Sequence, residues 1–158
     1  MSDRPFIAKL PKKAKHGDEI VIRGKLKDDA SVFSINLCLP RPPTVCADET
    51  PPYIAYHFKT IFRDDGSSVV VHNWKNHIWQ TEVREDNYWM YDRAQRFTLI
   101  FRFHNEAIKV FAEDVQHTPD YEFEHQFPFE DITTIELWDD IEFIDEISFK
   151  YKNDDNDQ

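Results

Sequence analysis

Three side chains with complementary chemistry lie close together near the middle of the chain. Trp79 supplies a flat apolar ring, and Glu82 and Arg84 follow it, two residues apart. Residues two apart on a β-strand project from the same face, so this carboxylate and guanidinium can orient one another through a charge-assisted hydrogen bond. An indole ring beside fixed polar groups suits a ligand that has one apolar face and one polar edge. The segment therefore predicts a shallow binding face.

A second group of candidates lies just before it, on the strand expected over residues 53–62. Alternation along this strand assigns Phe58 and Phe62 to the core face. The opposite face carries His57, Lys59, Ile61 and Arg63. In the next expected strand, over residues 67–73, Asn73 shares a face with Val69 and Val71. Polar candidates from two neighbouring strands are thus expected on one surface.

The composition indicates that β-structure positions these residues. The chain has 158 residues, of which 15% are aromatic, including 13 Phe, with only 3 Gly. Bulky rings favour pleated sheet surfaces, and this length suits one domain with a substantial core. Eleven or so segments have strand-like patterns and are separated by turn residues. They are residues 6–10, 19–26, 31–39, 53–62, 67–73, 77–83, 97–104, 108–112, 121–127, 133–138 and 141–151.

The expected fold is all-β, a jelly-roll-like antiparallel β-sandwich of about eleven strands. A closed barrel with an interior cavity is the alternative, because that many strands with short turns can also close on themselves. We expect one domain over residues 1–151 and a frayed acidic tail over 152–158. The connection from Pro40 to Pro52 contains five prolines and is expected to be an irregular loop.

The same segments resemble the carbohydrate-recognition domain of the galectin family, whose pattern is H-x-N-x-R, then V-x-N, then W-x-x-E-x-R. The chain matches this pattern at His57, at Val71-His72-Asn73 and at Trp79 to Arg84. Flanking stretches are also similar, and the likeness spans residues 5 to about 151, nearly the whole chain. They include Pro5-Phe6, Leu10-Pro11, residues 17–24 and residues 33–37.

The resemblance implies a non-catalytic lectin that binds galactosides. It assigns the galactose hydroxyls to His57, Asn73 and Glu82 and the stacking plate under the sugar to Trp79. Arg84 would brace Glu82 and reach a neighbouring sugar residue. No cofactor and no metal is implied.

The first motif departs from the family pattern. Lys59 and Ile61 stand where the family has Asn and Arg, and Gln80 replaces a family Gly. Lys59 and Arg63 are the candidates to replace the lost contacts, since both are expected on the His57 face, although Lys lacks the planar guanidinium fork. The sequence therefore predicts weak or altered galactoside specificity. The alternative is a galectin-fold protein-interaction module that has lost sugar binding.

Charge and targeting features narrow the partners. The formal net charge of −11 disfavours nucleic acid, and no apolar run reaches membrane-spanning length, so we expect no membrane insertion. The first 20 residues lack the apolar core of a signal peptide. We expect a cytoplasmic protein, with galectin-like export that bypasses the signal peptide and self-association into a homodimer as implications of the resemblance. Cys38 and Cys46 are expected as free thiols, with one local bridge as the alternative.

The sequence offers two weaker alternatives, an enzyme site and a metal site. A glycosidase needs two carboxylates across a cleft, and the chain is rich in carboxylates, but nothing in the sequence pairs them. A metal site built from His57, His72 and His77 has no ligand spacing to support it. The acidic run over residues 136–146 lacks the regular spacing of a calcium loop and is expected to be a solvated rim.

Overall fold

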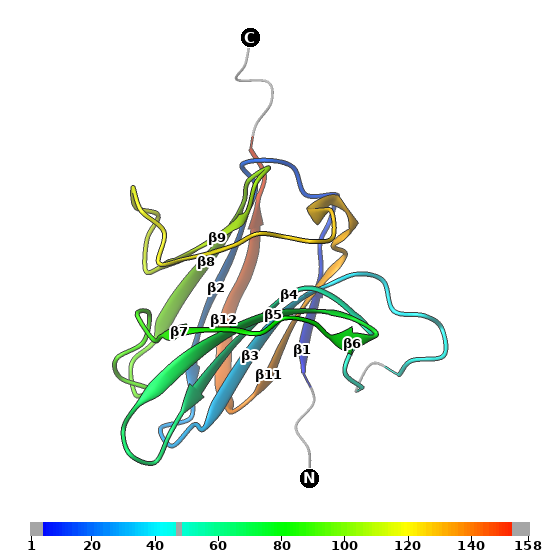
Figure 1. Cartoon of the computed structure of the whole chain (residues 1–158). Helices are drawn as coiled ribbons and strands as arrows, with labels where there is room; N and C mark the ends of the chain where they lie inside the picture. Colours follow the sequence, from blue (N-terminus) through cyan, green and yellow to red (C-terminus); the bar gives the residue numbers. More distant parts are fainter. Residues whose placement is uncertain (1–4, 47–48, 153–158) are drawn as a thin grey trace.

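The computed structural model describes residues 5–46 and 49–152, and it is built from strands. Twelve strands within these residues form two antiparallel sheets that face each other (Figure 1). This confirms the predicted all-β sandwich. The barrel alternative is wrong, because the strands pair as two separate sheets.

The first sheet has seven strands and carries the candidate site. Its hydrogen-bonded order is β1, β11, β3, β4, β5 and β6, and β7 also pairs with β5. The strands are β1 (Phe6–Lys9), β11 (Thr134–Asp139), β3 (Val32–Cys38), β4 (Tyr53–Phe62), β5 (Ser68–Asn76), β6 (Ile78–Trp79) and β7 (Val83–Asp86).

The second sheet has five strands in the order β10, β9, β8, β2 and β12. They are β10 (Tyr121–Phe123), β9 (Ile108–Ala112), β8 (Phe97–Phe103), β2 (Glu19–Leu26) and β12 (Ile141–Lys150). A short 3-10 helix, η1 (Phe129–Asp131), precedes β11. Within the described residues no helix is long and apolar enough to cross a membrane.

Alternating side chains from both sheets make the core. In β4, Phe58 is fully buried between the sheets, and in β8 Leu99 and Phe101 are buried opposite it. Because side chains alternate along a strand, the neighbours of Phe58, His57 and Lys59, point to the other face of the first sheet. We call this the outer face, and its two central β4 side chains are partly accessible.

The predicted strand over residues 77–83 is broken in the structure. His77 adopts a positive φ of 65° at the turn between β5 and β6, and Gln80 and Thr81 lie outside any strand. The Gln80 N–H donates to the carbonyl of Trp74 at 3.1 Å. Pairing with β5 resumes in β7 and continues to Asp86, past the end of the predicted strand at residue 83.

The sequence predicts an irregular connection after β3 and a frayed tail at the C-terminus. Residues 40–46 and 49–52 form an irregular loop, as predicted, and Figure 1 shows the connection in cyan at the right of the view. The predicted tail over 152–158 lies outside the described residues except for Lys152, whose backbone N–H donates to Asp18 at 2.7 Å. Cys38 is buried, Cys46 is exposed, and no disulfide joins them, so the alternative of a local bridge is wrong.

Candidate functional site

Four polar side chains form one row across the outer face of the first sheet. Glu136 of β11 is the register partner of Asn36 in β3. Asn36 is in turn the partner of His57 in β4, and His57 is the partner of Asn73 in β5. Register partners in antiparallel strands lie about 5 Å apart, so the row crosses four adjacent strands. The predicted His57 and Asn73 are therefore neighbours.

Asn36 fixes the orientation of His57. The Oδ1 of Asn36 lies 2.5 Å from Nδ1 of His57. With the amide oxygen as acceptor, Nδ1 must carry the hydrogen, which leaves Nε2 as an acceptor. Burial is the main cause that lowers the pKa of His57 from 6.5 to about 3, with smaller contributions from the positive charges of Lys59 and Lys75. The imidazole is therefore neutral near pH 7 and can accept a hydrogen bond from a ligand hydroxyl.

Trp79 lies directly beside this histidine. The ring centroids of His57 and Trp79 are 4.4 Å apart, with the planes inclined by 49°. The ammonium nitrogen of Lys75 lies 5.1 Å from the indole centroid, and Lys75 is the register partner of Trp79. Trp79 remains 41% exposed. An indole held at this edge and still accessible can stack against the apolar face of a ligand.

Asn73, Glu82 and Arg84 supply the remaining polar groups. The Oδ1 of Asn73 accepts from the Trp74 N–H at 2.8 Å, so its amide nitrogen is left to act as a donor. Val83 pairs with His72, which places the preceding Glu82 beside Asn73. The Nε of Arg84 donates to Glu82 Oε2 at 2.6 Å, so the two side chains orient one another as predicted.

The two candidate substitutes lie at different distances from this group. Lys59 follows His57 by two residues on the same face, and its partners in register are Ser34 and Val71. Arg63 lies beyond the end of β4, in a turn where its backbone N–H donates to the Ser67 carbonyl at 2.8 Å. Arg63 is six residue steps along the chain from His57, about 20 Å at about 3.3 Å per residue. The structure thus brings Lys59 to the site and leaves Arg63 away from it.

Two side chains of the site were not predicted from the sequence. Asn36 alternates with buried Ile35 and Leu37, a period-two signal that could have placed it on the outer face. Lys75 reaches Trp79 because the chain turns tightly between β5 and β6. The sequence instead predicts one continuous strand over residues 77–83. Asn36 orients the histidine, and Lys75 adds a cation at the indole.

The three histidines of the metal alternative do not converge. His72 points into the core, where its Nδ1 lies 2.7 Å from the Tyr56 hydroxyl, while His57 lies on the outer face. Among the residues that the structure describes, no group of three His, Cys, Asp or Glu side chains is placed to hold a metal ion.

Fold and site together define a class of protein. A two-sheet antiparallel sandwich presents, on one sheet face, an accessible indole, a fixed neutral imidazole and a carboxylate braced by arginine. These are the parts with which a protein binds a sugar without transforming it, since they supply a stacking plate and hydroxyl partners. The class is a carbohydrate-binding lectin.

Comparison with known families agrees: residues 5–149 match the galactoside-binding lectin family, so the chain belongs to that family, the galectins. The chain is 27% identical to human galectin-7 over 142 residues, which cover 90% of this chain and 95% of that protein. It is 21% identical over 137 residues to a 32 kDa beta-galactoside-binding lectin of Caenorhabditis elegans, covering 87% of this chain and 45% of that protein.

Solved structures show the same fold. The crystal structure of Xenopus laevis galectin-Ib superposes with a TM-score of 0.70 at 22% identity, covering 92% of this chain and 98% of that one. These comparisons confirm the galectin resemblance and the non-catalytic interpretation, because the family consists of lectins.

Proposed function

We propose that the protein binds β-galactoside glycans on the outer face, with His57, Asn73, Trp79, Glu82 and Arg84 as the contact residues. The observation that carries this proposal is the fixed imidazole beside the indole. The Nδ1 of His57 lies 2.5 Å from Asn36 Oδ1, and the ring centroids of His57 and Trp79 are 4.4 Å apart. Galactose has one apolar C–H face and one polar edge, which matches a plate and a row of polar groups set side by side.

Each residue has a definite role in this proposal. Trp79 stacks beneath the apolar face of the sugar, and Nε2 of His57 accepts a hydroxyl hydrogen. The Asn73 amide donates to a second hydroxyl, and the Glu82 carboxylate accepts from it or from its neighbour. Arg84 holds Glu82 in place, as their 2.6 Å contact supports, and it faces the next sugar of the chain, as the family resemblance implies.

The specificity should differ from that of a family member with the full motif. Ile61 can neither donate nor accept a hydrogen bond, and Lys59 offers a single ammonium group. A hydrogen bond to a charged group contributes about 1.5 to 3 kcal/mol, whereas a ligand with millimolar to micromolar affinity has only about 4 to 8 kcal/mol in total. We therefore propose weak lactose binding, with a glycan other than lactose as the preferred ligand.

Titration calorimetry with lactose, together with a glycan array, tests the proposal. The wild type should bind lactose weakly and should bind at least one array glycan more tightly. Trp79→Ala should weaken both responses at least tenfold. Tyr91→Ala is the matched control, because Tyr91 is an aromatic residue with 93% exposure outside the row. If neither the array nor the titration shows a sugar response in the wild type, the proposal is wrong.

A protein-interaction module is the second candidate function. Four large apolar side chains are at least half exposed on or near the β6 and β7 segment. They are Ile78, Val83, Tyr88 and Tyr91. Such side chains are typical of contact surfaces. A folded protein without any sugar response would favour this function. Homodimer formation stays a prediction, to be checked by sedimentation.

A further inference from the structure

The connection between β3 and β4 is longer than is needed to join two neighbouring antiparallel strands. These strands are antiparallel neighbours, and hairpin connections of that kind usually take about 2 to 5 residues. Here the connection runs from Leu39 to Pro52, between the ends of the two strands. Loops of this length are uncommon in compact domains and are often functional, so the place of this loop on the protein surface matters.

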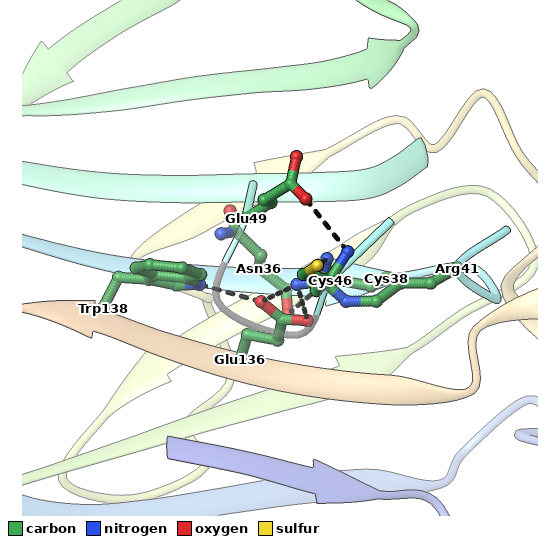
Figure 2. Close-up of polar contacts among 7 residues, drawn as sticks. All are labelled: Asn36, Cys38, Arg41, Cys46, Glu49, Glu136 and Trp138. Carbon is green, nitrogen blue, oxygen red and sulfur yellow. Dashed lines mark hydrogen bonds and ion pairs between the residues drawn. The ribbon is translucent and has the colours of Figure 1, made fainter. Parts of the chain in front are cut away.

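Arg41 fixes that place by a contact with β11. Its Nη2 lies 3.1 and 2.9 Å from the two carboxylate oxygens of Glu136 (Figure 2). The indole N–H of Trp138 also donates to this carboxylate, at 2.9 Å. The Glu136 side chain is only 1% exposed, and that of Arg41 is 17% exposed. A buried carboxylate held by a guanidinium and an indole is a firm anchor for the loop.

The rest of the segment is tied to the same anchor. The other terminal nitrogen of Arg41, Nη1, donates to the carbonyl of Cys46 at 2.7 Å. Two hydrogen bonds join Cys46 and Glu49: the Cys46 N–H donates to the Glu49 carboxylate at 3.1 Å, and the Glu49 N–H donates to the Cys46 carbonyl at 3.1 Å. Figure 2 shows these contacts as one connected group. Arg41 therefore ties Cys46, and through it Glu49, to β11.

Glu136 belongs to the row that contains the sugar site. Ile135 and Leu137, on either side of it, are buried in the core, so Glu136 points to the outer face. Its register partner is Asn36, the residue that orients His57. The Arg41 anchor therefore lies on the outer face, one strand beyond Asn36.

A separate hollow begins on the far side of the anchor. It has a volume of about 450 Å³ and lies over β1 and β11, with Arg41 and Glu136 in its wall. The other lining residues include Ile7, Lys9, Pro40 and Thr134. Because the strand order is β1, β11, β3 and β4, the Arg41 contact stands between this hollow and His57.

We propose that the Arg41–Glu136 contact holds the described residues of this connection, 40–46 and 49–52, as a wall that ends the saccharide groove over β3 and β11. This inference rests on the proposed galactoside function. With the next sugar directed toward Arg84, an extension from the opposite side of the bound galactose runs into the wall. The site then takes the terminal unit of a glycan chain and rejects an internal one.

Two ligands and two loop variants test this wall. Lactose places its galactose at the end of the chain, whereas α1,3-galactosyl-lactose carries one more sugar on that galactose. The wild type should bind the trisaccharide at least tenfold more weakly than lactose. The double variant Arg41→Ala with Glu136→Gln releases the loop without leaving a buried carboxylate unpaired. It should bring the two affinities within about twofold of each other.

A second variant and a matched control separate the wall from general disturbance of the sheet. Replacing residues 42–50 with a short Gly-Ser linker removes the wall itself. This variant should also bring the affinities for lactose and for the trisaccharide within about twofold of each other. The control is Arg23→Ala with Glu146→Gln, which removes an arginine–glutamate pair, 2.7 Å apart, from the second sheet. This control variant should keep the wild-type ratio of lactose affinity to trisaccharide affinity.

The outcomes distinguish this inference from the function on which it rests. Lactose binding with equal affinity for the trisaccharide in the wild type would overturn the wall and leave the lectin function intact. A wild-type preference for lactose that persists in both loop variants would also overturn it. The absence of any saccharide response in the wild type would overturn the proposed function and the wall together.

Discussion

The two ends of one polar row differ in how their side chains are held. At the β6 and β7 end, Trp79 is 41% exposed, and the side chains of Glu82 and Arg84 are 45% and 48% exposed. At the β11 end, Glu136 is buried and is bonded to both Arg41 and Trp138. Both ends contain a tryptophan and an arginine–glutamate pair, but only one end presents them to a ligand.

The difference shows how the same residue types can serve a site or a scaffold. A buried ion pair needs all its partners, because a charge left without one is costly in a dry environment. An exposed pair costs little to rearrange and contributes little to stability. We expect the β11 end to control stability and the β6 and β7 end to control affinity.

The largest expected effect is on stability at the β11 end. Arg41→Ala should lower the free energy of unfolding by about 3 kcal/mol, because the buried Glu136 carboxylate loses its cation. Urea denaturation measures this loss. Adding Glu136→Gln should restore part of it. Arg84→Ala, which breaks the exposed pair, should cost under about 1 kcal/mol. Equal losses for the two arginine variants would contradict the contrast between the ends.

The middle of the row should give the protein an acid-sensitive stability. The folded-state pKa of His57, about 3, lies below the ordinary value of 6.5, so the unfolded chain takes up a proton first as the pH falls. The stabilisation from the neutral imidazole is complete above about pH 6.5 and is lost progressively toward pH 3. Between pH 7 and pH 5 this one residue should account for about 2 kcal/mol.

His57→Gln checks this prediction, because the variant keeps a polar side chain at the position but has no group that titrates. Urea denaturation at pH 7 and at pH 5 should show a loss of stability that is about 2 kcal/mol smaller in the variant than in the wild type. The same pH dependence in both proteins would show that His57 is not the group responsible.

At the β6 and β7 end the expected effect is on affinity. Trp79→Ala should weaken glycan binding at least tenfold, about 1.4 kcal/mol, while the urea midpoint changes little, since the ring is partly exposed. Trp138→Phe is the matched change at the other end, and it should lower stability through the lost contact with Glu136. A similar loss of affinity in both variants would contradict the expectation that only the β6 and β7 end controls affinity.

The smallest predicted effect is a gain. Ile61 lies on the outer face of β4, beside Val69 of β5, at the position where the family pattern has arginine. Ile61→Arg should strengthen lactose binding about threefold, because it restores a cationic donor, although part of that gain is offset by the cost of ordering a long side chain. Ile61→Gln serves as the control for polarity alone. Unchanged or weaker lactose affinity in Ile61→Arg would show that the groove differs in shape from the family pattern.

Local signals were enough to predict most of the strands. In β4 the alternation of His57 and Lys59 with Phe58 identified the outer face, because period-two burial is encoded in neighbouring residues. The same reasoning failed over residues 77–83. The turn at His77, with its positive φ, depends on pairing with β5 and has no glycine to mark it.

The Arg41–Glu136 contact that anchors the loop could not be predicted from the sequence for a different reason. Arg41 and Glu136 are 95 residues apart, and their contact depends on β11 lying next to β3. Without that pairing, Glu136 is indistinguishable in the sequence from its acidic neighbours, and the prediction of a solvated rim is wrong for this residue because it is buried. The site residues could be named from a motif, whereas the boundary of the site required the sheet order.

The most direct measurement of the central claim is the response of the four tryptophan indole N–H resonances to lactose in a proton–nitrogen NMR titration. Trp79 should shift with increasing lactose. Trp89, which is buried and bonded to Thr60, and Trp138, which is bonded to Glu136, should not shift. This result would place the sugar at the exposed end of the row. No shift at Trp79 with saturating lactose, or an equal shift at Trp138, would contradict the account.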